Sequence, residues 1–349
     1  MKSVRNIILI LLAAAAVGGY VIIKPYYDFL TNTLQISPLK TLFFDNSVKT
    51  ISGTVNILVL GIAGGTHDGP NLSDSIVVLH YNFDTDHLDT IGIPRDIWSG
   101  TLKDKINSAY AYGETKQEDG GLKLAKAEVG SIIGTPIQYS IVISFSKYKE
   151  LIDYIGGIDV PVENSFVDNE FPIEGKENDL CGGDSNYRCR YETIRFTKGQ
   201  TYMDSTTALK FVRSRHSEGD EGSDFARSKR QQLVVAAIKD KIVKIIKTYD
   251  LDKIKSLYAK TDSLVNRDVT NQQLVTIGKD IVFSKKFRLK NFVLPEKLFK
   301  VPNYSDYNGM YVLIPATNWN DIHSFVTCVM DKEDEKVCTS LVNQGKENK

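Results

Sequence analysis

The sequence predicts an α/β protein, with a central β-sheet flanked by helices, behind an N-terminal transmembrane helix. The sheet is predicted by short apolar runs at 55–60, 75–79 and 88–93, each bordered by a glycine-rich, polar or charged motif. Strands of open α/β folds have this pattern, because their functional groups gather at the strand ends. Helical patterns follow later in the chain, and the membrane helix is predicted by an uncharged apolar run over 7–23.

The composition is that of a folded protein with a full hydrophobic core. Of its 349 residues, 42% are hydrophobic and 25% are charged, and the formal net charge is zero. A protein that binds nucleic acid through a broad surface usually carries an excess of positive charge. The neutral balance gives no support for a nucleic-acid partner, and none is expected.

The N-terminal run has the features of a signal anchor. Lys2 and Arg5 precede it, so residues 1–6 are expected to stay in the cytoplasm and residues 7–23 to cross the cell membrane once. The alternative is a cleaved signal peptide, because the alanines at 13–16 offer small residues for cleavage. The apolar run continues beyond these alanines, which favours the uncleaved anchor. Under both interpretations the rest of the chain is extracellular.

The elements beyond the anchor are predicted from apolar runs and from the residues that end them. Residues 24–53 are interpreted as a juxtamembrane spacer. Pro161 marks the strand predicted at 158–162 as an edge strand. Asn308-Gly309 is expected to form a two-residue hairpin turn. The polar segment 339–349 is expected to be a flexible tail. The remaining predicted strands lie at 137–145 and 158–162, and the helices lie at 122–133, 147–155, 204–212, 224–246, 251–264 and 271–283.

Four cysteines form two close pairs. Cys181 and Cys189 bracket a short polar loop, and Cys328 and Cys338 bracket a charged one. In an exported chain such pairs favour two local disulfides. A metal site is the alternative, but neither pair has CxxC spacing or a histidine at the spacing of a zinc ligand.

The densest basic stretch runs from 213 to 232, beside the start of a predicted helix. Guanidinium groups next to a helix N-terminus suit a pyrophosphate or several phosphates. The alternative is a solvated helix start whose cations pair with the acidic loop at 217–223. The side chains that would share one side of an extended segment are Arg213 and Arg215, and those that would share one helix face are Arg227, Arg230 and Gln231.

Seven motifs behind the predicted anchor, taken in order, resemble those of the LytR-CpsA-Psr family. No single motif is decisive, but their order behind an export anchor is specific, and they cover roughly residues 55–245. The motifs are Asn-Ile-Leu-Val-Leu-Gly (56–61), Ser-Asp-Ser (73–75), Ile-Pro-Arg-Asp (93–96), Lys-Ile-Asn (105–107) with Ala-Tyr-Gly (111–113), Gly-Gly (120–121), Phe-Val-Arg-Ser-Arg (211–215) and Asp-Phe-Ala-Arg-Ser-Lys-Arg-Gln-Gln (224–232).

The resemblance implies a phosphotransferase of the bacterial outer surface. Such enzymes transfer an anionic glycopolymer, such as a teichoic acid or a capsule chain, from a polyprenyl-pyrophosphate carrier to peptidoglycan and form a sugar-1-phosphate linkage. The implied fold is a central mixed β-sheet flanked by helices, an α/β/α sandwich, with an apolar lipid pocket and Mg²⁺ beside an arginine cluster. On this basis residues 54–250 are the catalytic domain, and residues 251–338 are a helical and β-hairpin extension packed on it.

The resemblance also implies roles for individual residues. Asp74 matches the metal aspartate of the family. Asp96 is expected to orient Arg95, or to act as a base toward the acceptor hydroxyl. The charge that develops on the pyrophosphate would be stabilised by hydrogen-bond donors. The donors expected there are Arg95, Lys105, Arg213, Arg215, Arg227, Arg230 and Gln231.

One position departs from the family. A second metal aspartate usually follows the first strand motif as Gly-x-Asp, and Ala63 stands there in this chain. Asp68, or His67 in the same loop, is expected to supply the missing ligand, and the alternative is an ordinary turn at Asp68-Gly69-Pro70. The departure leaves a non-catalytic polyprenyl-phosphate-binding protein as a second interpretation. A transcriptional attenuator is the third, and both export and the neutral charge argue against it.

Overall fold

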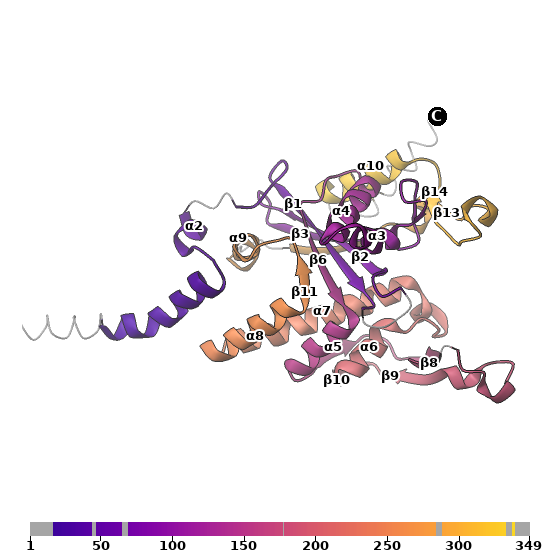
Figure 1. Ribbon diagram of the computed structural model, residues 1–349, viewed down its shortest axis with the longest axis horizontal. Helices are drawn as coiled ribbons and strands as arrows, with labels where there is room; N and C mark the ends of the chain where they lie inside the picture. The colour runs from indigo at the N-terminus through magenta and orange to yellow at the C-terminus, as the bar shows by residue number, and fades with distance from the viewer. Residues whose placement is uncertain are drawn as a thin grey trace, which may run out of the picture.

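The computed structural model describes residues 17–43, 47–64, 69–176, 178–283, 288–332 and 337–338. A six-stranded mixed sheet lies at its centre (Figure 1). In spatial order its strands are β11 (Val265–Arg267), β6 (Tyr139–Ser144), β1 (Thr54–Ile62), β2 (Ser73–Asn82), β3 (His87–Gly92) and β12 (Arg288–Val293). β1 runs antiparallel to β2 and parallel to β6, and β3 runs parallel to β12.

The central strand β1 is mostly apolar because both of its faces are buried. Leu58, Leu60 and Ile62 belong to one core, and Val55 and Ile57 belong to another on the opposite face. This alternation follows the two-residue period of a strand, and burial on both faces requires helices on both sides of the sheet. The strands predicted at 55–60, 75–79, 88–93 and 137–145 are confirmed as β1, β2, β3 and β6.

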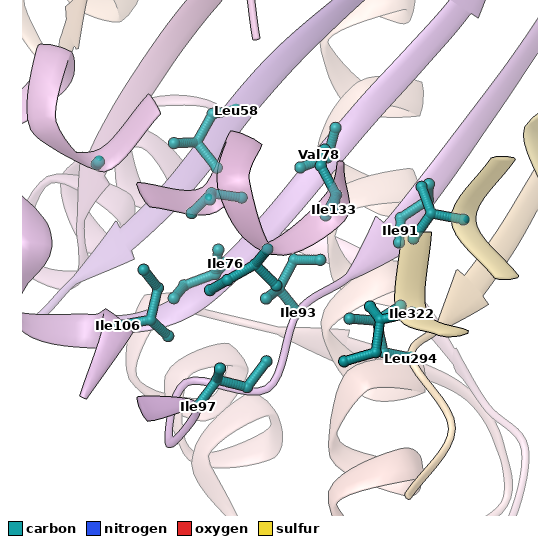
Figure 2. Packing of buried hydrophobic residues seen from close by; sticks show 14 of the residues in the cluster. Leu58, Ile76, Val78, Ile91, Ile93, Ile97, Ile106, Ile133, Leu294 and Ile322 are labelled. Atoms are coloured by element: carbon teal, nitrogen blue, oxygen red, sulfur yellow. The ribbon is translucent and has the colours of Figure 1, made fainter. Parts of the chain in front are cut away.

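One face of the sheet is covered by α3 (Ala109–Lys116), α4 (Gly120–Ile133) and α10 (Trp319–Lys332). Figure 2 shows Ile133 of α4 and Ile322 of α10 in the same apolar cluster as Val78 of β2. α3 and α4 approach each other closely, since a Cβ atom on Gly113 would lie 2.3 Å from the carbonyl oxygen of Gly120. The glycines of two of the seven motifs therefore allow these helices to pack.

The opposite face of the sheet is covered by α9 (Asn271–Phe283), whose Ile277 packs with Val55 and Tyr81. Before the sheet, residues 17–28 are helical and continue into a short π-helix, Phe29–Thr33. The ring of Phe29 meets the ring of Tyr258 edge-on, on α8 (Leu251–Ser263). The short helix α2 (Pro38–Phe43) lies against α9. The N-terminal segment thus packs on helices from the C-terminal half.

A second hydrophobic core adjoins the edge of the sheet at which β6 ends. Three helices build it: α5 (Phe145–Tyr154), α6 (Ser205–Arg213) and α7 (Asp224–Ile246). Two ribbons complete it, β7 (Ile158–Val162) with β10 (Gly199–Met203), and β8 (Phe166–Pro172) with β9 (Tyr191–Phe196). Among the described residues β7 pairs only with β10, so the predicted edge strand is confirmed. The helices predicted at 122–133, 147–155, 204–212, 224–246, 251–264 and 271–283 are confirmed as α4 to α9.

Both predicted disulfides are present. Cys181–Cys189 closes a loop between β8 and β9, and Cys328–Cys338 joins α10 to the segment after it. The two bridges differ in their surroundings, because Cys338 is fully buried in the core under α10. The alternative of a metal site at these cysteines is excluded by their pairing.

The C-terminal segment is built into the sheet and does not only pack on it, since β11 and β12 are two of its six strands. β13 (Phe299–Lys300) and β14 (Ile314–Pro315) pair antiparallel, as expected of a hairpin. The predicted two-residue turn at Asn308-Gly309 is wrong. Asn308 instead ends a 3₁₀ helix, Tyr304–Tyr307, within the longer loop that joins the two strands.

The part of the predicted membrane span that the structure describes, residues 17–23, is helical. Within the described ranges, no helix combines the length and the apolar character needed to cross a membrane. Residues 1–16, with the predicted cytoplasmic N-terminus and most of the span, lie outside these ranges, as does the predicted tail at 339–349.

A row of polar side chains crosses the buried sheet. His80 and Asp89 are partners in register, and Lys290 is the next residue in the row. His80 Nδ1 lies 2.7 Å from Asn56 Oδ1, whereas Asp89 Oδ2 is buried without a hydrogen-bond partner among the described residues. Burial raises the pKa of Asp89 to about 6, although Lys290 opposes the rise. The folded protein therefore holds a proton there at pH values at which the unfolded chain has lost it.

We expect Asp89→Asn to stabilise the protein at pH 8 and to have little effect at pH 4. A carboxyl group whose pKa is raised by folding makes the folded state less stable as the pH rises from the ordinary pKa through the raised pKa. The difference between 3.8 and about 6 corresponds to about 3 kcal/mol. The free energy of unfolding in urea at both pH values tests this. The control is Asp159→Asn, on the exposed side of β7, and a gain for Asp89→Asn that is equal at both pH values would contradict the prediction.

Candidate active site

Four strand ends meet at one edge of the sheet. The parallel strands β1 and β6 end there and β2 begins there, since Ile62 pairs with both Ser73 and Ser144. β3 runs antiparallel to β2 and therefore ends at the same edge. The topology thus gathers Ala63, Asp74 and the loop after β3, as the sequence predicts for strand-end motifs.

A chain of alternating charges lies at this edge, and we call it the edge network: Asp74, Arg95, Asp96 and Lys105. Arg95 Nη1 donates a hydrogen bond to Asp74 Oδ1. Arg95 Nε lies 3.7 Å from Asp96 Oδ2, and Lys105 Nζ donates to Asp96 Oδ1 at 2.7 Å. The four side chains are between 23% and 34% exposed. A ligand can therefore reach them, and water screens their field only in part.

Backbone hydrogen bonds from a distant segment hold the loop that carries Arg95 and Asp96. The Leu313 N–H donates to the carbonyl oxygen of Asp96 at 2.9 Å, and the Trp98 N–H donates to that of Leu313 at 2.9 Å. The Asn107 N–H donates to the carbonyl oxygen of Arg95 at 3.3 Å. Local sequence patterns do not reveal the contribution of Leu313, because they carry no information on pairing between distant segments.

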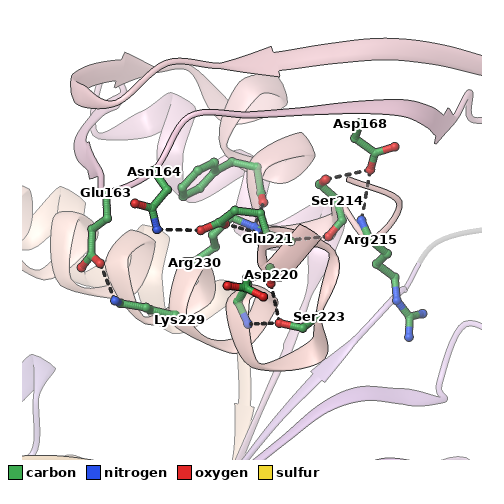
Figure 3. A network of polar contacts seen from close by, with 12 residues as sticks. Glu163, Asn164, Asp168, Ser214, Arg215, Asp220, Glu221, Ser223, Lys229 and Arg230 are labelled. Atoms are coloured by element: carbon green, nitrogen blue, oxygen red, sulfur yellow. Dashed lines mark hydrogen bonds and ion pairs between the residues drawn. The ribbon is translucent and has the colours of Figure 1, made fainter. Parts of the chain in front are cut away.

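A buried carboxylate shapes the segment after α6. Asp168 Oδ2 accepts hydrogen bonds from the Ser214 hydroxyl at 2.7 Å and from the Arg215 N–H at 3.1 Å (Figure 3). It also accepts one from the His216 N–H at 3.2 Å. Asp168 Oδ1 accepts from the Glu170 N–H at 3.0 Å. Burial alone would raise the pKa of Asp168, but these hydrogen bonds outweigh it and hold the pKa below its ordinary value. In Figure 3 the Arg215 side chain points away from this carboxylate.

Arg230 lies inside the protein and is only 3% exposed. Its guanidinium donates to the carbonyl oxygens of Phe211 and Ser214 at 3.0 and 2.7 Å, and to the Glu221 carboxylate at 2.9 Å. It also lies 4.7 Å from the centre of the Phe166 ring. These contacts match the ion-pair alternative for Arg230 and leave its predicted contact with a pyrophosphate without support.

The other predicted phosphate ligands lie nearer to the surface. Arg215 is exposed, and Arg213, Arg227 and Gln231 are partly exposed. The guanidinium of Arg213, the last residue of α6, lies 6.0 Å from the centre of the Phe171 ring. β6 leads directly into α5, and α5 packs against α6. The arginine segment therefore belongs to the structural unit that adjoins the sheet edge (Figure 1).

Two of the cavities in the described part of the chain lie elsewhere. One, of about 490 Å³, runs along the N-terminal helix from Tyr20 to Thr33 and reaches Lys255. The other, of about 370 Å³, adjoins Arg230. Neither borders Arg95 or Arg213, so the lipid pocket that the resemblance implies stays a prediction. The second cavity is lined by the apolar side chains of Val162, Phe166, Phe211, Ala226 and Leu233 and by Glu163, Asn164, Asp220, Glu221, Ser223, Lys229 and Arg230.

Of the predicted metal ligands, only Asp74 lies within the described ranges, since Asp68 and His67 lie outside them. Its Oδ1 accepts from Arg95, and its Oδ2 has no partner among the described residues. Magnesium usually binds one or two carboxylates and takes its other ligands from water and phosphate oxygens. A partly exposed carboxylate with one available oxygen therefore fits an ion that is shared with a phosphorylated substrate.

Comparison with known proteins identifies a family and relatives for this chain. The LytR_cpsA_psr family model matches residues 34–323. The polyisoprenyl-teichoic acid–peptidoglycan teichoic acid transferase TagU of Bacillus mycoides (strain KBAB4) is 30% identical over 247 residues, which are 68% of this chain and 70% of that protein. Regulatory protein MsrR of Staphylococcus aureus (strain Mu50 / ATCC 700699) is 26% identical over 268 residues, 76% of this chain and 70% of that protein. The crystal structure of B. subtilis TagV has the same mixed α/β fold, with a TM-score of 0.55 at 22% identity, over 81% of this chain and 99% of that chain.

We expect Asp168→Asn to destabilise the protein at pH 7 and to cost less as the pH falls. A carboxyl group whose pKa is lowered by folding contributes stability above its ordinary pKa, and this is lost as the pH falls through the lowered value. The amide carries no charge and presents an NH₂ group to donors, so the loss at pH 7 should be about 3 kcal/mol. Ser214→Ala, which removes one donor, should cost about 1 kcal/mol. Urea unfolding at pH 7 and pH 3 measures both, and wild-type stability of Asp168→Asn at pH 7 would show that the carboxylate does not hold this turn.

Proposed function

The chain belongs to the LytR_cpsA_psr family, and we propose that it transfers an anionic glycopolymer from a polyprenyl-pyrophosphate carrier to peptidoglycan, forming a sugar-1-phosphate linkage. The observation that carries the proposal is the edge network, which holds two cations and two carboxylates in contact where the strand-end motifs meet. The name of the Bacillus mycoides relative describes a transfer of teichoic acid to peptidoglycan. This supports the same class of reaction here.

The proposed reaction is a substitution at phosphorus. An oxygen of the acceptor hydroxyl forms a bond to the phosphorus atom that carries the sugar, and the bond from that phosphorus to the bridging oxygen breaks. The hydroxyl proton passes to a base, and polyprenyl phosphate leaves with the bridging oxygen. Negative charge grows on the leaving oxygen, so donors that are already fixed beside it lower the barrier.

Arg95 is the donor best positioned for this task. Its ion pairs with Asp74 on one side and Asp96 on the other orient the guanidinium. Its Nε is buried without a hydrogen-bond partner among the described residues, and the 3.7 Å to Asp96 Oδ2 is too long for a hydrogen bond. Catalytic hydrogen bonds often tighten only when substrate binds. In the proposal Arg213, Arg215 and Arg227, with Lys105 and Gln231, add donors around the pyrophosphate.

Asp96 lies between two cations and orients both of them. Because Asp74 is assigned to the metal, Asp96 is also the carboxylate proposed to accept the proton of the acceptor hydroxyl. Mg²⁺ is the proposed cofactor, held by Asp74 and by phosphate oxygens of the substrate, with Asp68 as a further ligand. When bound it would neutralise charge on the pyrophosphate.

The proposal places the chain in the cell membrane, with its N-terminus in the cytoplasm and its catalytic domain outside. The apolar run over 7–23 and the preceding Lys2 and Arg5 support this orientation. Both proposed substrates agree with it, because the carrier is a membrane lipid and peptidoglycan is extracellular. The catalytic domain would then work beside the membrane that holds its donor.

A second candidate is a protein that binds polyprenyl phosphates without transferring them. It is favoured by Ala63, whose side chain has no atom that could ligate a metal at the sheet edge. Turnover of a short-chain polyprenyl-pyrophosphate saccharide, with Mg²⁺ and a peptidoglycan glycan as acceptor, separates the two candidates. Transfer supports the enzyme, and binding without transfer supports the binding protein. The name of MsrR describes a regulator, but the zero net charge of this chain gives no support for contact with DNA.

Arg215→Ala and Arg227→Ala should each lower turnover about a hundredfold and leave folding intact. A donor to the charge that develops in the transition state contributes roughly 3 kcal/mol. Initial rates and urea unfolding midpoints are the measurements. The matched control is Arg188→Ala, because Arg188 pairs with Asp184 on the loop closed by the first disulfide, and it should keep the wild-type rate. Wild-type rates in the first two variants would mean that the segment is a solvated helix start.

Mg²⁺ should bind weakly to the protein alone and tightly only with a pyrophosphate present. One described carboxylate is a poor cage for magnesium, and pyrophosphate oxygens would complete its coordination. Calorimetric titration with and without a polyprenyl-pyrophosphate analogue measures the difference, which Asp74→Asn should abolish. Ala63→Asp, which restores the family residue, should strengthen binding to the free protein. Equal affinities in the two titrations would refute this, because the protein would then contain a complete cage of its own.

A further inference from the structure

Four aromatic side chains, which we call the aromatic platform, stand beside the edge network: Trp98, Tyr304, Tyr307 and Tyr311. The tyrosines lie on the loop between β13 and β14, which projects beyond α3 in Figure 1, and Trp98 lies in β4 (Trp98–Ser99). The rings of Trp98 and Tyr307 meet edge to face with centres 5.0 Å apart, and those of Tyr304 and Tyr311 are 6.5 Å apart. Tyr304 is 50% exposed and Tyr311 is 47% exposed.

The platform is attached to the edge network. Trp98 pairs in register with Lys105 of β5 (Asp104–Lys105). Lys105 Nζ lies 5.9 Å from the centre of the Tyr311 ring, within the range of a cation–π contact. The same ammonium group donates to Asp96, and the Leu313 N–H bonds to the Asp96 carbonyl oxygen. A molecule lying on the platform would therefore extend toward Asp96.

Exposed aromatic rings flanked by polar groups are suited to sugar rings. The C–H bonds on one face of a pyranose carry partial positive charge and pack against the negative face of an aromatic ring. Asn303, Asp306 and Asn308 are exposed on the same loop. Their amide and carboxylate groups can hydrogen-bond to the hydroxyl and acetamido groups at the edge of a sugar. The loop thus combines the two kinds of contact that a carbohydrate needs.

We propose that the aromatic platform binds sugar rings of the acceptor, the glycan strand of peptidoglycan, and sets its hydroxyl beside Asp96. The identity of the acceptor rests on the proposed function. Two observations favour the acceptor over the anionic donor polymer. The contacts run in the order Asp74, Arg95, Asp96, Lys105, Tyr311, so the platform lies at the opposite end from the assigned metal ligand. The loop at 301–313 carries one charged residue, Asp306, and no cation of its own that could attract an anionic polymer.

The test measures binding of a tetrasaccharide of alternating N-acetylglucosamine and N-acetylmuramic acid to the full chain by calorimetry, without donor. Tyr304→Ala/Tyr311→Ala should weaken binding about tenfold, and Tyr304→Phe/Tyr311→Phe should preserve it, because the rings remain. If the double variant does not fold, Tyr304→Ala alone replaces it in the binding measurement. The control is Tyr249→Ala, which removes a tyrosine that is 75% exposed just before α8 and should leave binding unchanged.

The outcomes separate the platform from the proposed function. In steady state the double alanine variant should raise KM for the acceptor glycan and leave KM for the lipid-linked donor unchanged. A raised donor KM alone, or weaker binding to phosphatidylglycerol vesicles with unchanged glycan binding, would overturn the proposal in favour of a polymer or membrane contact. Absence of glycan binding by the wild type, or binding that survives the alanine substitutions, would overturn it as well. Glycan binding that depends on the tyrosines, in a chain without transferase activity, would support the platform and refute the proposed function.

Discussion

Burial of both faces of the central sheet decides where this protein can place charge. Helices α4 and α10 cover one face and α9 covers the other, so an ionised group in the middle of a strand loses its hydration. Asp89 shows the cost: one of its buried oxygens has no hydrogen-bond partner in the described part of the chain, and its pKa is raised to about 6. Within the central sheet, charged side chains that act on a ligand are therefore restricted to the strand ends. The packed core behind them also lowers the local dielectric, which strengthens the field of the edge network.

The elements that sequence patterns predict correctly are those whose signal is local. β1 contains a continuous apolar run, and α7 is preceded by its N-cap Ser223, whose hydroxyl accepts from the Ala226 N–H. β11 has three residues and no recognisable period, and it exists because it pairs with β6. At Asn308-Gly309 both residues have positive φ, as a hairpin turn requires, but they follow a 3₁₀ helix. The local conformation was predictable there, whereas the surrounding structure was not.

The sequence patterns identified which residues belong to the candidate site better than they predicted how those residues are arranged in space. Helical spacing puts Arg227, Arg230 and Gln231 on one face, yet Arg230 is enclosed by the acidic loop and two phenylalanine rings. Asp168 belongs to none of the recognised motifs, because it stands in an unremarkable polar run of β8, and it nevertheless directs the segment that carries Arg215. Such roles depend on which segments meet in space. They become visible only when the hydrogen bonds are known.

The pairing of β3 with β12 has a consequence for how this chain folds. The Thr90 hydroxyl donates to Asn291 across 201 residues of sequence, and the loop at Asp96 is anchored by Leu313. Contacts between such distant segments close long loops, and chains rich in them fold slowly. Until the C-terminal segment has docked, β3 presents an open edge that can pair with other chains. A chain cut short before β12 would therefore be an aggregation-prone intermediate, and the order of synthesis itself delays a working edge network until nearly the whole polypeptide has been made.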